Sequence, residues 1–138
     1  SLVDKTRIDS YLKQMGYGNV DLSGGINEFW LESSLKISPI EQVKILEKLY
    51  TYKLPFSRRN IDIVKKTIKL SDQDKITLYG KTGTGIVNGN QLNGWFVGFV
   101  ESKGKVFAFA TNIQGKVWTD GATAKTITLS ILKDKYIL

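Results

Sequence analysis

Apolar residues recur at helical spacing in the first half of the chain. Residues 6–15 place Ile8, Tyr11, Leu12 and Met15 at positions i, i+3, i+4 and i+7, and Gly16 follows. This pattern predicts a short helix that ends at Gly16. The segment after it, from residue 17 to residue 31, is long and rich in glycine and aromatic residues, which is typical of a functional loop rather than a linker.

Two further helices have clear start signals. Ser38, Pro39 and Glu41 stand at the positions of an N-cap, a first helical residue and a capping-box partner. The apolar face expected for this helix is formed by Ile40, Val43, Ile45, Leu46 and Leu49. After Pro55, Ser57 is predicted to cap a third helix over residues 58–69. Its inward positions are expected to be Ile61, Val64 and Ile68.

The period then changes from helical to extended. Strands are predicted over residues 76–81, 94–101 and 105–111, with a tight hairpin at residues 102–104 between the last two. The strands are apolar at successive positions, so both faces of the sheet are expected to be covered by helices. Asp120 is predicted to cap a final helix, whose apolar residues are Ala122, Ala124, Ile127, Leu129, Ile131 and Leu132.

These elements predict an α+β fold, an antiparallel sheet with helices on both faces and the last helix packed on the sheet. The length of 138 residues fits one domain, and the sequence shows no internal repeat or low-complexity tract. No apolar run reaches the roughly 18–20 residues that span a bilayer. The chain contains neither cysteine nor histidine, which excludes disulfides, thiol catalysis and a histidine general base within it.

The formal net charge of +7 comes from basic residues spread along the chain, with the densest points at Arg58-Arg59 and Lys65-Lys66. A solvated helix face accounts for such pairs, and a basic nucleic-acid-binding module is an alternative from another class. No recognised nucleic-acid-binding motif accompanies the charge. A basic surface around an anionic substrate is also compatible with it.

The strongest chemical signal is the segment 79–85, Tyr-Gly-Lys-Thr-Gly-Thr-Gly, at the end of the first predicted strand. Lys81 can neutralise a carboxylate, and the Thr82 hydroxyl can donate a hydrogen bond to the same group. Gly83 has no Cβ, so the amide of a ligand can approach the strand edge. The backbone N–H of Thr84 could then point at a developing oxyanion.

With these residues the chain resembles the serine penicillin-recognising superfamily, and within it the class D, oxacillinase-type β-lactamases and the closely similar sensor domains of β-lactam receptors. The supporting segments occur in the family's order: 17–19 (Tyr-Gly-Asn), 29–39 (Phe-Trp-Leu to Ser-Pro), 81–85 and 94–101. The resemblance implies a penicillin-recognising fold. It also implies that residues 1–138 are the C-terminal portion of a single β-lactamase/transpeptidase-like domain.

The resemblance also implies roles for individual residues. Lys81 and Thr82 would be catalytic-site residues that bind the β-lactam carboxylate. The residues implied to bind substrate are Gly83, Thr84, Trp30, Leu31 and Lys125. The indole N–H of Trp30 would hold the carboxylated lysine that serves as general base, whereas its residue type alone favours a core aromatic beneath a loop. The segment 17–19 is expected to fix loop geometry.

Two departures from the family pattern affect this interpretation. The family's nucleophile and base lysine lie in an S-x-x-K motif upstream of Tyr-Gly-Asn, so both are expected outside this segment. Three S-x-x-K strings do occur here, at residues 10–13, 33–36 and 130–133. All three lie after the point where the family places the motif, which argues against their serines as the nucleophile. An arginine that many class D enzymes carry in the last helix is replaced by Ala124, next to Lys125.

The resemblance therefore implies a hydrolase that opens β-lactams through an acyl-enzyme, with an acylated, signalling receptor domain as the alternative. This segment alone is not expected to be active. No metal or bound cofactor is expected, because the CO2-derived carboxylated lysine of the family lies outside the segment. The implied partners are β-lactams and the N-terminal half of the same domain, with no nucleic acid and with a membrane only through an upstream anchor. The implied location is extracytoplasmic.

Overall fold

The computed structural model describes residues 4–87, 89–115 and 119–138. Their elements are α1 (Lys5–Met15), α2 (Pro39–Tyr50), α3 (Arg58–Thr67), β1 (Lys69–Gln73), β2 (Ile76–Val87), β3 (Asn90–Ser102), β4 (Lys105–Gln114) and α4 (Gly121–Asp134). The strands form one four-stranded antiparallel sheet in the order β1-β2-β3-β4. None of the helices within the described ranges is long and apolar enough to cross a membrane.

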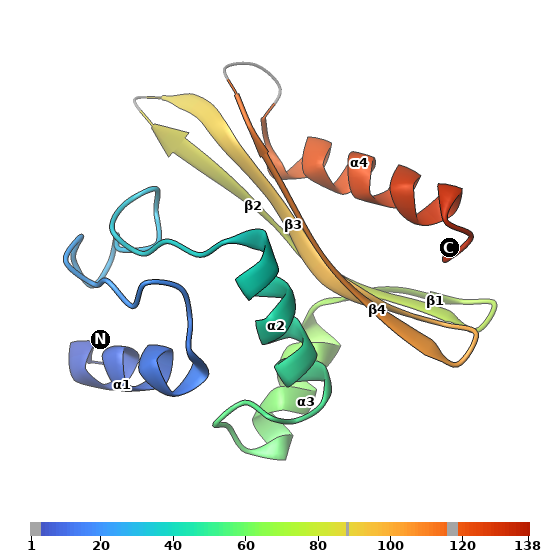
Figure 1. The fold of residues 1–138 in the computed structure, drawn as a ribbon, viewed down its shortest axis with the longest axis horizontal. Coiled ribbons are helices and arrows are strands. Elements are labelled where there is room, and N and C mark those ends of the chain that lie inside the picture. Colours follow the sequence, from blue (N-terminus) through green and yellow to red (C-terminus); the bar gives the residue numbers. More distant parts are fainter. Residues whose placement is uncertain (1–3, 88, 116–118) are drawn as a thin grey trace.

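Helices cover both faces of the sheet, as the apolar strands predict. Figure 1 shows α4 on one face and α1, α2 and α3 on the other. Neighbouring residues of β3 pack on opposite faces of the sheet. Phe99 packs in a cluster with α2 and α3, whereas Val100 packs with Leu132 of α4. Phe96, Phe99 and Val100 are fully buried, so the centre of β3 is the part of the sheet that both helical layers share.

The helix starts follow the capping signals. Ser38 and Glu41 form a capping box at the start of α2, with Pro39 at the first helical position. Ser57 caps α3, and Asp120 caps α4 by accepting from the Thr123 N–H at 2.7 Å. Gly16 ends α1 with a left-handed backbone at φ 67°.

The third helix and the first strand differ from expectation. The helix ends at Thr67 rather than residue 69, and residues 69–73 form β1, which the sequence did not indicate. Every residue of β1 is exposed, so this strand has no apolar alternation to detect. It forms because the turn at Asp74 and Lys75, both with positive φ, folds it back onto the start of β2.

The later strands are longer than the apolar runs that predict them. β2 continues to Val87, β3 begins at Asn90 and β4 ends at Gln114. Their added segments are polar or glycine-rich, and they pair with one another, with a shift of the β2–β3 register between Gly85 and Ile86. The β3–β4 turn, Lys103-Gly104, has positive φ at both residues, as a two-residue hairpin requires.

Two apolar residues expected on inward faces are exposed instead. Ile40 is 71% exposed and Val64 is 45% exposed, so their assignment to the buried faces of α2 and α3 is wrong. Ile40 lies in the first turn of α2, ahead of the turns that reach the sheet, and α3 contributes only Ile61 to the buried cluster. In α4, Ala124 and Leu132 are buried, whereas Ile131 is half exposed.

Candidate functional site

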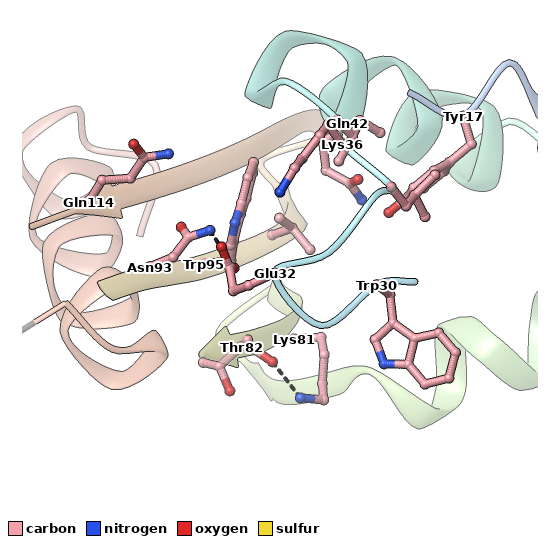
Figure 2. A pocket seen from close by; sticks show the side chains of 14 residues that line it. Tyr17, Trp30, Glu32, Lys36, Gln42, Lys81, Thr82, Asn93, Trp95 and Gln114 are labelled. Carbon is pink, nitrogen blue, oxygen red and sulfur yellow. Dashed lines mark hydrogen bonds between the residues drawn. The ribbon is translucent and has the colours of Figure 1, made fainter. Parts of the chain in front are cut away.

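A cavity of about 520 Å³ lies between the loop after α1 and the face of the sheet that carries α2 (Figure 2). It is lined by Tyr17, Trp30, Glu32, Leu35, Lys36, Ile37, Gln42, Lys81, Thr82, Gly83, Asn93, Trp95, Val97 and Gln114. The lining therefore combines one loop, the start of α2, the middle of β2 and β3, and the last residue of β4. Residues far apart in the sequence meet here through the antiparallel register.

The Lys-Thr-Gly segment occupies a stretch of β2 that β1 does not reach. β1 pairs with β2 only as far as the Lys69–Tyr79 pair, and Gly80 donates its N–H to Ile68 O at 2.8 Å. From Lys81 onward, no other strand of the described ranges pairs with the outer side of β2. The backbone of residues 81–85 therefore forms a sheet edge that an extended ligand can approach.

The N–H directions along this edge follow from the position of Gly80. Successive residues of a strand direct their N–H groups to opposite sides, and the β2–β3 register is uninterrupted from Ile76 to Gly85. Because the Gly80 N–H points outward to Ile68, the N–H groups of Thr82 and Thr84 also point to the outer edge. The Thr84 amide thus has the direction that an oxyanion donor at this edge needs.

Lys81 is exposed and extends along the same edge. Its ammonium donates a hydrogen bond to the carbonyl oxygen of Thr82, as the dashed line in Figure 2 shows. A backbone carbonyl is a neutral partner, so an anionic ligand would be a stronger acceptor for this cation. The lysine is therefore placed to exchange that contact for a carboxylate at the edge of the cavity.

The Thr84 side chain faces α4 and not the cavity. Its hydroxyl accepts a hydrogen bond from the Gly121 N–H at 3.0 Å. A Cβ on Gly121 would lie 2.8 Å from Gly83 O and 2.9 Å from Thr82 Cβ. The start of α4 therefore packs directly against the Lys-Thr-Gly segment, and only a glycine allows this distance.

Trp30 lines the cavity from the loop, and its side chain is 53% exposed. The alternative of a core aromatic buried beneath the loop is therefore wrong. Its neighbour Phe29 is the buried residue, packing with Leu12 and Leu22 and meeting the Trp30 ring edge-on at 4.7 Å. Phe29 anchors the loop, and Trp30 remains accessible. Leu31 is 59% exposed and is not among the lining residues.

The Tyr-Gly-Asn segment fixes the geometry of this loop, as expected. Asn19 donates its amide to Ser34 O at 2.9 Å and accepts from the Lys36 N–H at 2.9 Å. Gly18 has φ 54°, and a Cβ there would lie 1.9 Å from Lys36 O. Tyr17 lines the cavity, and burial raises the pKa of its hydroxyl. The two ends of the loop are thus held together.

Several candidates lie outside the cavity. Ala124 is fully buried against the sheet, and Lys125, beside it, does not line the cavity. The serines of the three S-x-x-K strings, Ser10, Ser33 and Ser130, do not line it either. Among the described residues no group of three or more acidic, cysteine or histidine side chains could hold a metal ion.

The sequence assigned no site role to Glu32, Asn93, Trp95 and Gln114, which also line the cavity. The register brings three of them together, because Gly83 pairs with Trp95 and Gly85 with Asn93, which in turn pairs with Gln114. Only the strand lengths and register reveal this. The one sequence signal is the pair of glycines at positions 83 and 85. They have no side chains, so they leave room over β2 for side chains of the facing strand.

Two of the four paired basic residues of α3 lie over aromatic rings. The Arg58 guanidinium lies 4.3 Å from the centre of the Tyr52 ring, and the Lys65 ammonium lies 4.5 Å from that of Tyr50. Arg58, Arg59 and Lys66 line a shallow separate depression together with Asp62 and Ile63. Half of these charges are thus engaged by aromatic rings.

Comparison with known proteins gives the family. The model of the penicillin binding protein transpeptidase domain matches residues 2–133. The chain belongs to this family.

Within the family, this transpeptidase-like chain is similar both to enzymes and to receptors. It is 44% identical over 131 residues to the probable β-lactamase YbxI of Bacillus subtilis, which covers 95% of the chain and 47% of that protein. It is 43% identical over 135 residues to the regulatory protein BlaR1 of Bacillus licheniformis, covering 98% of the chain and 22% of BlaR1. The solved C-terminal domain of the Bacillus licheniformis BlaR penicillin receptor superposes with a TM-score of 0.91 at 41% identity, over 99% of this chain and 55% of that domain.

These similarities confirm the penicillin-recognising α+β fold and the resemblance to class D β-lactamases and receptor sensor domains. The chain spans about half the length of the β-lactamase it matches and about a fifth of the receptor.

Proposed function

We propose that this chain supplies the carboxylate-binding and oxyanion-binding side of a class D β-lactamase site. In this proposal a serine outside the segment attacks the lactam carbonyl, its proton is passed to the ring nitrogen as the C–N bond opens, and an ester forms on the serine. Water, activated by a carboxylated lysine that also lies outside the segment, then hydrolyses the ester. The product is the ring-opened acid, and the serine regains its proton.

The observation that carries the proposal is the placement of Lys81, Thr82 and Gly83 along an unpaired strand edge that borders a cavity. A β-lactam presents a carboxylate and, across its ring, a carbonyl that becomes an oxyanion. Lys81 and the Thr82 hydroxyl are suited to the carboxylate. The Thr84 N–H, which points to the same edge, is suited to the oxyanion.

The loop supports the second half of the proposed reaction. Trp30 faces solvent at the cavity while Phe29 and the Asn19 contacts hold its loop in place. An indole N–H needs an acceptor when a site closes around it. We assign that acceptor to the carboxylated lysine contributed from outside the segment, which requires Trp30 to be accessible as it is here.

A receptor that is acylated but deacylates slowly is the second candidate. It is favoured by the similarity to the BlaR penicillin receptor and by Ala124, which is buried where many class D enzymes carry an arginine. With Ala124 and Lys125 both outside the cavity, Lys81 and Thr82 would hold the carboxylate in either case. Both candidates imply an extracytoplasmic location.

Intact-mass spectrometry of the complete protein with benzylpenicillin tests the proposal. We expect an adduct of one penicillin per chain, mapped by digestion to a serine outside residues 1–138, that disappears within seconds to minutes. An adduct that persists for hours identifies the receptor candidate instead. Absence of any adduct, or an adduct on Ser10, Ser33 or Ser130, contradicts both.

A further inference from the structure

Glu32 connects the loop to the sheet at the edge of the cavity. Its Oε1 accepts a hydrogen bond from the Asn93 side-chain amide at 2.7 Å, across 61 positions of sequence. Figure 2 shows the two side chains pointing toward one another, with Trp30 farther along the same loop. Because both groups are part-buried, this contact between a carboxylate and an amide is one of the stronger hydrogen bonds available to a neutral donor.

The strand beneath Glu32 leaves room for it. A Cβ on Gly85 would lie 2.0 Å from Glu32 Oε1 and 2.5 Å from its Cδ. The carboxylate therefore rests directly on β2, four residues beyond Lys81. Any larger residue at position 85 would push the carboxylate away from Asn93, since only the flexible end of Glu32 can move.

The contact continues across the sheet. Asn93 Oδ1 accepts from the Asn112 amide at 2.5 Å, and Asn112 Oδ1 accepts from Gln114 at 3.1 Å. Asn112 also donates to Gly94 O at 3.3 Å. A chain of side-chain hydrogen bonds thus runs from the loop over β3 to β4, and it fixes the orientation of the Asn93 amide toward Glu32.

The backbone of Glu32 is in a conformation that needs such support. Its φ is 52°, in the left-handed region that residues with a Cβ seldom adopt. A conformation of this kind persists when surrounding contacts hold it in place, and such residues cluster at functional sites. The contact to Asn93 is the side-chain interaction that holds Glu32 here.

We propose that Glu32, bound to Asn93 over Gly85, is a positioning residue that sets the place of Trp30 relative to the Lys81–Gly83 edge. Glu32 lies two residues after Trp30, so its hydrogen bond to Asn93 of β3 fixes the part of the loop that follows Trp30. Phe29 fixes the part before Trp30, and Asn19 holds the two ends of the loop together. This inference rests on the proposed function, in which Trp30 serves deacylation and Lys81 serves acylation. Loss of the contact should therefore affect mainly the second step.

The test uses the complete protein and benzylpenicillin, with acylation and deacylation rate constants measured separately by stopped-flow and intact-mass analysis. We expect Glu32→Ala to slow deacylation about 10-fold, while acylation changes by less than about 3-fold, because a loop displacement of an ångström or less affects the step that Trp30 serves. Glu32→Gln keeps the acceptor oxygen and is expected to retain deacylation within about 2-fold.

Two further variants test the mechanism. Gly85→Ala should reproduce the deacylation defect of Glu32→Ala without altering Glu32, and the double variant should be no slower than either single one. Glu28→Ala is the matched control, since Glu28 is an exposed glutamate of the same loop. Equal slowing of both steps in Glu32→Ala, or a Glu28→Ala defect of the same size, would overturn the proposal.

Hydrogen exchange separates this inference from the proposed function. If the loop is held by the contact, Glu32→Ala and Gly85→Ala should both accelerate amide exchange in residues 28–35 and leave the strands unchanged. This result would support the positioning contact even if the protein never reacted with penicillin. Unchanged exchange in both variants would refute it, whatever the kinetics of the wild-type protein.

Discussion

The Thr84 hydroxyl accepts a hydrogen bond from the backbone N–H of Gly121 at 3.0 Å, which joins the strand of the Lys-Thr-Gly segment to the first residue of α4. The N–H is one of the donors that a helix leaves without a partner at its start. Gly121 is buried, so water has little access to this donor. Loss of this contact should therefore affect both the stability of the protein and the strand edge formed by residues 81–85.

Replacing Thr84 with valine should destabilise the complete protein by about 1–3 kcal/mol, because it leaves the buried N–H of Gly121 without its acceptor. Thermal or urea unfolding measures this change. Thr126→Val, which removes an exposed hydroxyl that donates to Ala122 O within α4, is the control and should have an effect near zero. Equal losses in the two variants would show that the Thr84 contact has no special importance.

Gly121→Ala should lower the rate of acylation as well as stability. The new Cβ would meet Gly83 O at 2.8 Å, a backbone atom that moves only with its strand. The strand edge that we propose binds the ligand would shift with it, so we expect an acylation defect larger than that of Ala122→Gly, a change at the exposed next position. If Gly121→Ala reacts with penicillin at the wild-type rate, the packing of α4 does not control the edge.

Lys81→Ala should reduce the second-order rate constant for acylation by about 10- to 100-fold, because it removes a charged hydrogen bond to the ligand carboxylate. The loss should appear as weaker binding, a higher KM, in a turnover assay with penicillins. Lys105→Ala, an exposed lysine at the start of β4, controls for the general charge of the protein. An unchanged rate constant for Lys81→Ala would remove this residue from the site.

Trp30→Ala should slow deacylation more than acylation, so that acyl-enzyme accumulates during turnover. The physical reason is that the indole N–H is assigned to the group that activates the hydrolytic water of the second step. The exposed Ile40 of α2 offers a control in Ile40→Ala, which should leave both steps unchanged. Equal slowing of the two steps by Trp30→Ala would contradict the assigned role.

The cap of α4 predicts a dependence of stability on pH. The pKa of Asp120 is lowered, first by the backbone hydrogen bond from Thr123. A group whose pKa is lower in the folded protein contributes stability above its unfolded pKa of about 3.9, and this contribution is lost as the pH falls toward the folded pKa. Melting temperatures of Asp120→Asn, which keeps a good N-cap, should therefore fall less than those of the wild type between about pH 5 and pH 3. Parallel curves would show that Asp120 makes no such contribution.

The helices and the centre of the sheet were predictable because their signals are local. Caps such as Ser38 with Glu41 and the apolar runs around Phe99 need no knowledge of the rest of the fold. The strand β1 was not predictable, because its five residues are all exposed and it depends on the turn at Asp74 and Lys75. Its formation is a consequence of pairing with β2 and not of its own pattern.

The candidate site likewise combines residues that local sequence signals reveal with residues that only the fold brings together. Lys81, Thr82, Gly83 and Trp30 could be found from motif and resemblance, and the structure brings all four to one cavity. Glu32 and Asn93 could not, since they are 61 positions apart and meet only through the loop geometry and the extended ends of β2 and β3. The Thr84 N–H direction likewise required the Gly80–Ile68 contact.

A crystal structure of the complete protein acylated by benzylpenicillin tests the central claim most directly. We predict that the penicillin carboxylate lies within about 3 Å of Lys81 Nζ and of the Thr82 hydroxyl, and that the carbonyl oxygen of the ester accepts a hydrogen bond from the Thr84 N–H. A carboxylate bound elsewhere, with Lys81 still on the Thr82 carbonyl, would contradict the account.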